Sequence, residues 1–132
     1  MNLFKVVCGI ISKDDHILIC RRKSEKSLGG YWEFPGGKVD NNETYEEALK
    51  RELIEELGLE VTIDCHFFNN KHQYETSTIE LISFKCTTTQ SKIILIDHDR
   101  IEWVKTHSLL EWRLAPADIP TAQKLINQNI DI

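Results

Sequence analysis

The sequence has no paired cysteines, although cysteine itself is present. Four cysteines are scattered along the chain without a C-x-x-C pair, each in an apolar or strand-like run: Cys8, Cys20, Cys65 and Cys86. Disulfide frameworks and zinc sites require cysteines at characteristic spacings, and none occurs here. We therefore interpret all four as small buried thiols in a reducing cytosol.

An excess of positive charge is also lacking. The formal net charge is −5 at pH 7, and no long basic run is present. A protein that binds duplex DNA or RNA neutralises phosphates with clustered lysine and arginine, so this composition argues against a nucleic-acid partner. An acidic enzyme can still bind a polyanionic small molecule if metal ions supply the positive charge.

Long apolar runs are missing as well. A membrane-spanning helix needs about 20 apolar residues, and no stretch approaches that length. The apolar run 3–11 is interrupted by Lys5 and lacks a cleavage-like end, which argues against a signal peptide. We expect a cytoplasmic protein with no membrane contact and no obligatory protein partner. Its 132 residues, 41% of them hydrophobic, are expected to form one domain over residues 1–132.

A strong helix signal is present over residues 44–57. Thr44 and Glu47 form the T-x-x-E pattern of a capping box, and Gly58 supplies a stop because glycine adopts a left-handed conformation freely. Leucines recur every four residues along this segment, at Leu49, Leu53 and Leu57. The spacing predicts an apolar stripe that faces the core.

Glutamates gather on another side of the same predicted helix. They stand at positions i, i+3 and i+4, which are Glu52, Glu55 and Glu56. Like charges at these spacings repel by about 0.2–0.5 kcal/mol per pair, and Arg51 can brace them but cannot neutralise them all. Carboxylate oxygens on one rigid face suit Mg²⁺ or Mn²⁺, and the lack of nearby histidine or cysteine argues against zinc. Taken alone, the spacing also fits a solvated acidic helix.

The rest of the chain alternates between strand and turn signals. Strands are predicted over residues 3–12, 16–21, 31–34, 60–68, 74–86 and 101–104. The first two of these read as a hairpin, and residues 69–73 read as a turn or loop. A short helix capped by Thr106 is expected over 106–112, and a last helix over 119–127, with Pro120 in its first turn. This order predicts an α/β fold, an α+β mixed sheet with helices packed on both sides.

Two stretches near the acidic helix are candidate ligand sites. A basic cluster follows the second predicted strand, at Arg21, Arg22, Lys23 and Lys26. It is either a phosphate clamp or a solvated basic loop. Gly36 and Gly37 let the backbone approach a ligand or metal ion, and they also suit a tight turn between strand and helix. Lys38, which follows them, could reach a phosphate.

The stretch 37–59 resembles the signature of the Nudix hydrolase family, G-x5-E-x7-R-E-U-x-E-E-x-G-U, in which U is aliphatic. Every fixed position matches, at Gly37, Glu43, Arg51, Glu52, Leu53, Glu55, Glu56, Gly58 and Leu59. The preceding run W-E-F-P-G-G is typical of the MutT-like branch. The resemblance covers nearly the whole chain and implies a Nudix-type α/β/α sandwich.

The family chemistry implied by this resemblance is metal-dependent hydrolysis of a nucleoside triphosphate to a monophosphate and pyrophosphate. The implied ligands of Mg²⁺, or of Mn²⁺ as the alternative ion, are Gly37, Glu52, Glu55, Glu56 and Asp97. His98 and Asp99 are alternates to Asp97, and a polar loop beside a strand is the other interpretation of that segment. One of the glutamates, or a more distant acid, would be the base for water. Arg51 would complete the catalytic set by orienting the glutamates, with Glu43 in support.

The resemblance also implies a nucleotide-binding wall. Its candidate residues are Arg22, Phe34, Lys38, Tyr74 and Asp118. Arg22 matches a basic residue that contacts the nucleotide, and Asp118 falls on a base-reading position. Tyr74 could stack on the base or be a core aromatic. The phrase L-A-P-A-D-I-P around Asp118 is similar to that of cytidine-triphosphate-preferring relatives.

Three functions are consistent with this sequence. The first is hydrolysis of oxidised deoxynucleotides such as 8-oxo-dGTP, which protects DNA. The second is the same chemistry on CTP or modified dCTP. The third is a nucleotide-binding module without catalysis, and the intact Glu52, Glu55 and Glu56 argue against it.

Overall fold

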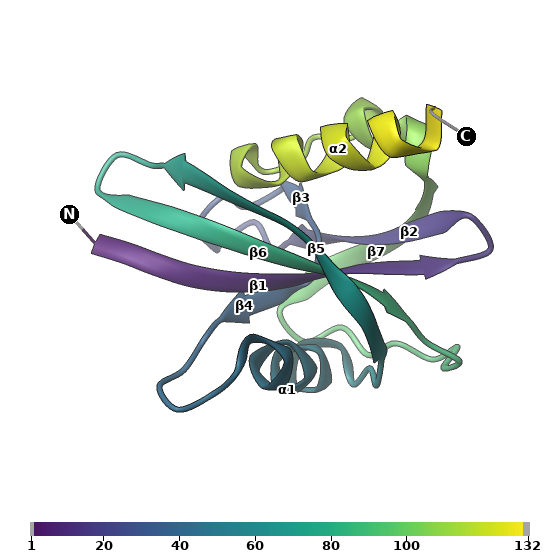
Figure 1. The fold of residues 1–132 in the computed structure, drawn as a ribbon, viewed down its shortest axis with the longest axis horizontal. Helices are drawn as coiled ribbons and strands as arrows, with labels where there is room; N and C mark the ends of the chain where they lie inside the picture. Colours follow the sequence, from purple (N-terminus) through teal and green to yellow (C-terminus); the bar gives the residue numbers. More distant parts are fainter. Residues whose placement is uncertain (1, 131–132) are drawn as a thin grey trace.

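The computed structural model describes residues 2–130, so Met1, Asp131 and Ile132 of the predicted domain lie outside the described residues. The strands are β1 (Asn2–Lys13), β2 (His16–Arg22), β3 (Trp32–Glu33), β4 (Gly36–Lys38), β5 (Thr62–Gln73), β6 (Ser77–Thr87) and β7 (His98–Lys105). The helices are α1 (Tyr45–Leu57) and α2 (Ile119–Ile130), with 3-10 turns η1 (Thr106–Glu111) and η2 (Pro116–Asp118). Figure 1 shows α1 on one side of the sheet and α2 on the other.

The strands form one mixed sheet. Its order is β3-β2-β1-β6-β5, with β4 paired to β1 and β7 paired to β2. The β1–β6 pair is parallel, whereas the other pairs are antiparallel, including the predicted β1–β2 hairpin. The predicted mixed sheet between helical layers is therefore confirmed.

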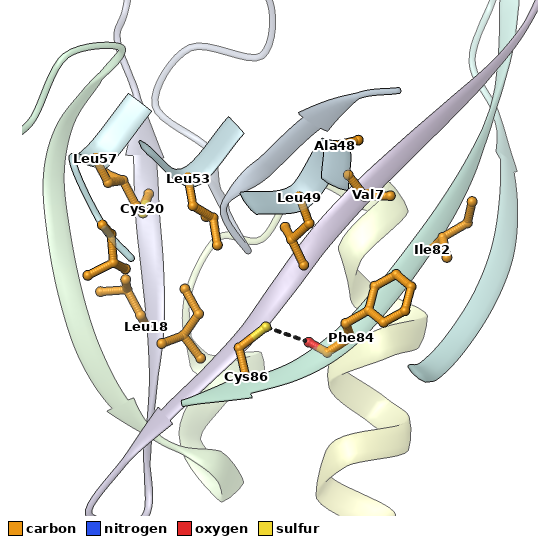
Figure 2. Close-up of a cluster of buried hydrophobic side chains, with 12 residues drawn as sticks. Val7, Leu18, Cys20, Ala48, Leu49, Leu53, Leu57, Ile82, Phe84 and Cys86 are labelled. Carbon is orange, nitrogen blue, oxygen red and sulfur yellow. Dashed lines mark hydrogen bonds between the residues drawn. The ribbon is translucent and has the colours of Figure 1, made fainter. Parts of the chain in front are cut away.

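Helix α1 begins and ends where its local signals predict. The Thr44 hydroxyl accepts the Glu47 N–H at 3.1 Å, and the Glu47 carboxylate accepts the Thr44 N–H at 2.8 Å, which completes the capping box. Gly58 closes the helix in a left-handed conformation with φ 59°. The leucine stripe, Leu49, Leu53 and Leu57, is fully buried. Figure 2 shows these leucines pointing toward side chains of β1, β2 and β6.

A second core lies on the opposite face of the sheet, under α2. It contains Cys8, Ile10, Ile19, Trp32, Phe34, Leu81, Leu109, Ala122 and Leu125 among its buried side chains. Strand β1 contributes to both cores because successive side chains of a strand point to opposite faces. Over the described range 2–130, no helix is both long and apolar enough to cross a membrane.

Strand β5 is longer than predicted. The prediction of a turn or loop at residues 69–73 is wrong, because these residues pair with residues 78–82 of β6. The chain turns later, where the Tyr74 N–H donates to the Ser77 carbonyl at 2.8 Å. Backbone pairing with a long neighbouring strand overrides the turn preference of the polar side chains here.

The predicted glycine turn is also a strand. Gly36 and Gly37 belong to β4, which pairs with Cys8 and Val7 of β1. A Cβ atom at Gly36 would overlap the backbone of Val7, so a side chain is excluded at that position. Absence of a side chain thus lets β4 approach β1 closely.

Two smaller predictions fail for similar non-local reasons. Thr106 is not a helix cap, since it is the first residue of η1 and its side chain is buried. Cys65 is exposed on edge strand β5, whereas Cys8, Cys20 and Cys86 are buried free thiols as predicted. Helix α2 contains Pro120 in its first turn, as predicted, and continues beyond Asn127.

Candidate active site

A cleft of about 540 Å³ is lined by residues of α1, of η2 and of the strands between them. The acidic side chains at one end are Glu52 and Glu56 of α1, and Ala117 and Asp118 of η2 lie at the other end. Most of the candidate site residues line it together: Arg22, Phe34, Gly37, Lys38, Glu52, Glu56, Tyr74 and Asp118. Arg51, Glu55 and Asp97 are not part of its lining.

Glu52 and Glu56 form a close pair of carboxyl groups. Their side chains are only 15% and 16% exposed. Burial raises the pKa of Glu56 to about 9, and a hydrogen bond to Glu52 and the charges of Glu52, Glu33 and Asp97 add to the shift. Two carboxyl groups this close disfavour a second negative charge unless a cation lies between them. The pair therefore fits a hard divalent cation, whose binding would release the proton.

Arg51 holds the neighbouring carboxylates in place. Its Nε lies 2.6 Å from Glu43 Oε2, and its Nη1 donates to Glu52 at 2.9 Å and to Glu55 at 3.2 Å. Nη2 also donates to the Lys38 carbonyl at 3.1 Å, which connects α1 to β4. These contacts raise the pKa of Arg51, with the Glu43 hydrogen bond as the largest cause. The guanidinium group thus fixes the orientation of Glu52.

Glu55 points away from the cleft. Its side chain is 58% exposed and is paired with Arg51. In the described part of the chain, no three His, Cys, Asp or Glu side chains are grouped as a ready-made metal site. Glu52 and Glu56 could supply two oxygen ligands, and Glu55 would have to leave Arg51 to supply a third.

Gly37 lies directly against the Glu52 carboxylate. A Cβ atom at position 37 would overlap the Glu52 side chain, so the absence of a side chain makes room for that carboxylate. Pairing of β4 with Val7 fixes the Gly37 backbone in this place. The oxygen-rich surroundings fit the donor set that Mg²⁺ prefers.

Gly37→Ala is expected to weaken metal-dependent activity by about 10-fold, since catalytic groups are sensitive to small displacements. The added methyl group must push the Glu52 carboxylate aside, but a flexible side chain can move without unfolding the protein. Mn²⁺ binding measured by electron paramagnetic resonance should weaken in parallel, while the melting temperature changes little. A folded variant with unaltered Mn²⁺ affinity would contradict this expectation.

The segment 97–99 presents a histidine to the cleft carboxylates. Asp97 is half-exposed and lies 3.5 Å from Lys26, and Asp99 pairs with Arg21 at 2.7 Å. His98, in contrast, is buried at the start of β7, with Nε2 2.8 Å from Glu33 and Nδ1 3.8 Å from Glu56. The sequence-based prediction includes His98 only as an alternate to Asp97 as a metal ligand.

Glu33 is a cleft residue that the sequence analysis does not identify. It lies in the W-E-F-P-G-G run, which is the signal that could have pointed to it. Both of its carboxylate oxygens lie 3.3 Å from Arg22 Nη1. Arg22 Nε also donates to the Ser27 carbonyl at 2.6 Å. Arg22 therefore lines the cleft as half of an ion pair, and Glu33 stands between the two ends of the cleft.

Asp118 is buried at the end of the cleft away from Glu52 and Glu56. Only 5% of its surface is exposed. Burial raises the pKa of Asp118 well above its ordinary value, the charge of Glu33 raises it further, and Arg22 opposes the shift. This environment favours the neutral carboxyl group, which has both a donor and an acceptor.

Hydrogen bonds from β5 and its turn hold η2 beside the sheet. The Tyr74 hydroxyl accepts the Ala117 N–H at 3.3 Å, and the Asn70 amide donates to the Ala117 carbonyl at 3.1 Å. Thr121 at the start of α2 donates to Asn70 at 3.2 Å. We call these three contacts the η2 strap, because they fix the position of Asp118.

The remaining candidate residues take different places. Phe34 is buried in the cleft wall, with 2% of its surface exposed. The Lys38 ammonium group lies 4.2 Å from the centre of the Phe4 ring, at the edge of the cleft. The Tyr74 ring packs edge-on against His72, with centroids 4.5 Å apart.

Comparisons with known proteins agree with this geometry. A family model described as NUDIX domain matches residues 3–125. The chain is 34% identical over 120 residues to a CTP pyrophosphohydrolase of Escherichia coli K12, an alignment that covers 91% of this chain and 89% of that protein. It is 38% identical to an 8-oxo-dGTP diphosphatase of Proteus vulgaris over 67% of this chain and 80% of that protein.

A solved structure shows the same fold. The solution structure titled DNA mismatch repair protein MutT (family Nudix hydrolase), from methicillin-resistant Staphylococcus aureus 252, superimposes with a TM-score of 0.77 at 38% identity. The match covers 97% of this chain and 99% of that chain.

Proposed function

This chain belongs to the Nudix hydrolase family, and from that membership we propose that it is a Mg²⁺-dependent nucleoside triphosphate diphosphatase. The reaction adds water across the α–β anhydride bond of the triphosphate and yields a nucleoside monophosphate and pyrophosphate. The observation that carries the proposal is the buried Glu52–Glu56 pair at one end of a cleft that holds Asp118 at the other. A nucleotide needs neutralising charge near its phosphates, which a cation held by the glutamates would supply, and a polar group that can bind its base.

The metal-binding residues in this proposal are Glu52 and Glu56, with Glu55 and the Gly37 carbonyl as further oxygen donors. When bound, Mg²⁺ supplies positive charge for the phosphate oxygens and polarises the attacking water. Arg51 keeps Glu52 oriented through their 2.9 Å contact. A glutamate of this group that does not hold the metal ion would accept the proton of water.

The nucleotide would occupy the cleft with its base toward Asp118. The cleft wall supplies the apolar side chains of Phe34, Ile79 and Leu81 for a planar base. Lys38 and Arg22 supply positive charge along the path to the phosphates, although Arg22 is already paired with Glu33. Asp118 supplies the group that distinguishes one base edge from another.

We favour oxidised deoxynucleotides such as 8-oxo-dGTP as the substrate. Their hydrolysis in the cytoplasm would prevent their incorporation into DNA. The relative named 8-oxo-dGTP diphosphatase supports this choice. CTP or modified dCTP is the second candidate, favoured by the E. coli relative that aligns over 91% of this chain. The intact motif glutamates argue against a binding module without catalysis.

The test is a panel of substrates with product analysis. Natural ribo- and deoxynucleoside triphosphates and 8-oxo-dGTP are incubated with the protein and Mg²⁺, and products are resolved by anion-exchange chromatography and phosphorus NMR. We expect monophosphate and pyrophosphate, lost in EDTA and restored by Mg²⁺. Orthophosphate together with a nucleoside diphosphate would overturn the proposal, as would the absence of any turnover.

A further inference from the structure

Among the residues of β7, His98 is the one that contacts the carboxylates of the cleft. It is 3% exposed and contacts two acidic residues from separate elements, Glu33 of β3 and Glu56 of α1. Its Nε2 has a hydrogen bond to Glu33 at 2.8 Å, whereas Nδ1 has no hydrogen-bond partner among residues 2–130. A buried polar atom without a protein partner is uncommon and calls for an explanation.

Glu56 is a candidate partner for Nδ1 of His98. Glu56 Oε2 lies 3.8 Å from Nδ1, so a small side-chain movement would bring the two atoms within hydrogen-bond distance. Glu56 instead shares a hydrogen bond with Glu52 in this structure. A hydrogen bond between Glu56 and Nδ1 needs one proton, carried either by the Glu56 carboxyl group or by Nδ1 of a doubly protonated ring, because Nε2 donates to the Glu33 carboxylate.

Pairing of β7 with β2 fixes the position of His98. Strand β7 pairs with β2 over its length, and an irregularity at Arg21/Arg22 puts His98 opposite Arg22. Arg22 and His98 therefore reach Glu33 together and hold its carboxylate from two sides. Glu33 belongs to the wall that the nucleotide would contact, and Glu56 belongs to the metal-binding end.

We propose that His98 is a positioning residue that connects the nucleotide wall to the metal-binding helix, through Nε2 to Glu33 and through Nδ1 to Glu56. The proposal rests on the proposed function, since it assigns a cation to Glu52 and Glu56 and a nucleotide to the cleft. His98 does not itself touch phosphate or water. It keeps Glu33 fixed for substrate binding and stabilises Glu56 in the orientation that binds the metal ion.

The two nitrogen atoms can be tested separately. The amide of glutamine reaches the position of Nε2, so His98→Gln retains a donor for Glu33 and loses the group beside Glu56. The shorter His98→Asn retains a group near Nδ1 and loses the contact with Glu33. Glu102→Gln is the matched control, because Glu102 lies on the same strand but pairs with Arg100 and does not line the cleft.

The readouts are Mn²⁺ affinity by electron paramagnetic resonance on the metal-free protein, KM and kcat for the best triphosphate, and the melting temperature. His98→Gln should weaken Mn²⁺ binding by about 10-fold with little change in KM, and His98→Asn should raise KM by about 10-fold with a smaller loss of Mn²⁺ affinity. Each effect is the size of one lost hydrogen bond to a charged group. Glu102→Gln should change none of the three.

A lower melting temperature in both variants, with Mn²⁺ affinity and KM unchanged, would overturn the proposal and leave His98 a purely structural residue. Equal losses of Mn²⁺ affinity and KM in both variants would overturn it as well. If the wild-type protein hydrolyses no triphosphate, the proposed function fails, whereas the Mn²⁺ titrations still decide whether His98 positions Glu56.

Discussion

Glu56→Gln is expected to lower kcat for pyrophosphate release by about 100-fold or more, the order of effect found when a charge-stabilising group is removed. Glu56 shares the acidic end of the cleft with Glu52, and an amide cannot replace a carboxylate as a ligand of Mg²⁺ at similar strength. Mn²⁺ affinity should fall in the same variant. Glu46→Gln is the matched control, because Glu46 is exposed in the first turn of the same helix.

The same substitution should not harm the fold. Burial raises the pKa of Glu56 to about 9, which means that the folded state disfavours its ionised form. The stability associated with the neutral carboxyl group is complete below the ordinary value of 4.5 and is lost as the pH rises toward 9. Glutamine remains neutral throughout, so in EDTA the variant should melt at the same or a higher temperature than the wild type at pH 8. Near-normal turnover with Mg²⁺ would show that Glu56 does not bind the metal ion.

Asp118→Ala is expected to remove most of the preference for 8-oxo-dGTP over dGTP. Guanine oxidised at C8 gains an N–H donor at N7, whereas intact guanine has a lone pair there. A mismatch at one buried polar group is worth about 10- to 150-fold in kcat/KM. Pyrophosphate should still be the product, because Asp118 belongs to η2, whereas Glu52 and Glu56 belong to α1. The measurement is kcat/KM for 8-oxo-dGTP, dGTP and CTP in both proteins.

A second substitution at the same position separates two modes of base reading. The sequence-based hypothesis assigns an ionised aspartate, which only accepts hydrogen bonds, but burial raises the pKa of Asp118 and favours its neutral form. Asp118→Asn imitates the neutral form. Retained preference in this variant would indicate a neutral acid, and lost preference would indicate a carboxylate. If Asp118→Ala leaves the ranking of substrates unchanged, Asp118 does not read the base, and if CTP exceeds 8-oxo-dGTP, the cytidine hypothesis replaces the oxidised-guanine one.

Helix α1 could be predicted because its signals are local. The capping box of Thr44 and Glu47, the stop at Gly58 and the four-residue leucine spacing all lie within a few residues of what they determine. Strand β5 could not be predicted to its end, since residues 69–73 are held by pairing with β6 rather than by their own preferences. Cys65 is exposed on the same strand, and the strand's own residues do not reveal that β5 lies at the edge of the sheet.

Some contacts of the candidate site could likewise be predicted from local spacing, whereas others could not. Glu52 and Glu56 stand one turn apart, so helical geometry alone places them together. Glu33 and His98 are 65 residues apart, and their contact depends on how β7 is aligned against β2. A shift of one residue in that alignment would turn Asp97 or Asp99 toward Glu56 instead. No pattern within either segment reveals which alignment the sheet adopts.

The η2 strap has a consequence for how this protein can diverge. The strap ties Ala117, the neighbour of Asp118, to Asn70 of β5 and to Tyr74 at the β5–β6 turn, whereas Glu52 and Glu56 are on α1, where Arg51 holds Glu52. The two ends of the cleft therefore have separate scaffolds. If Asp118 reads the base as proposed, mutations of Asn70 and Tyr74 would change which base is accepted and leave Glu52 and Glu56 in place. Redirection of substrate choice would then start from these two residues rather than from α1.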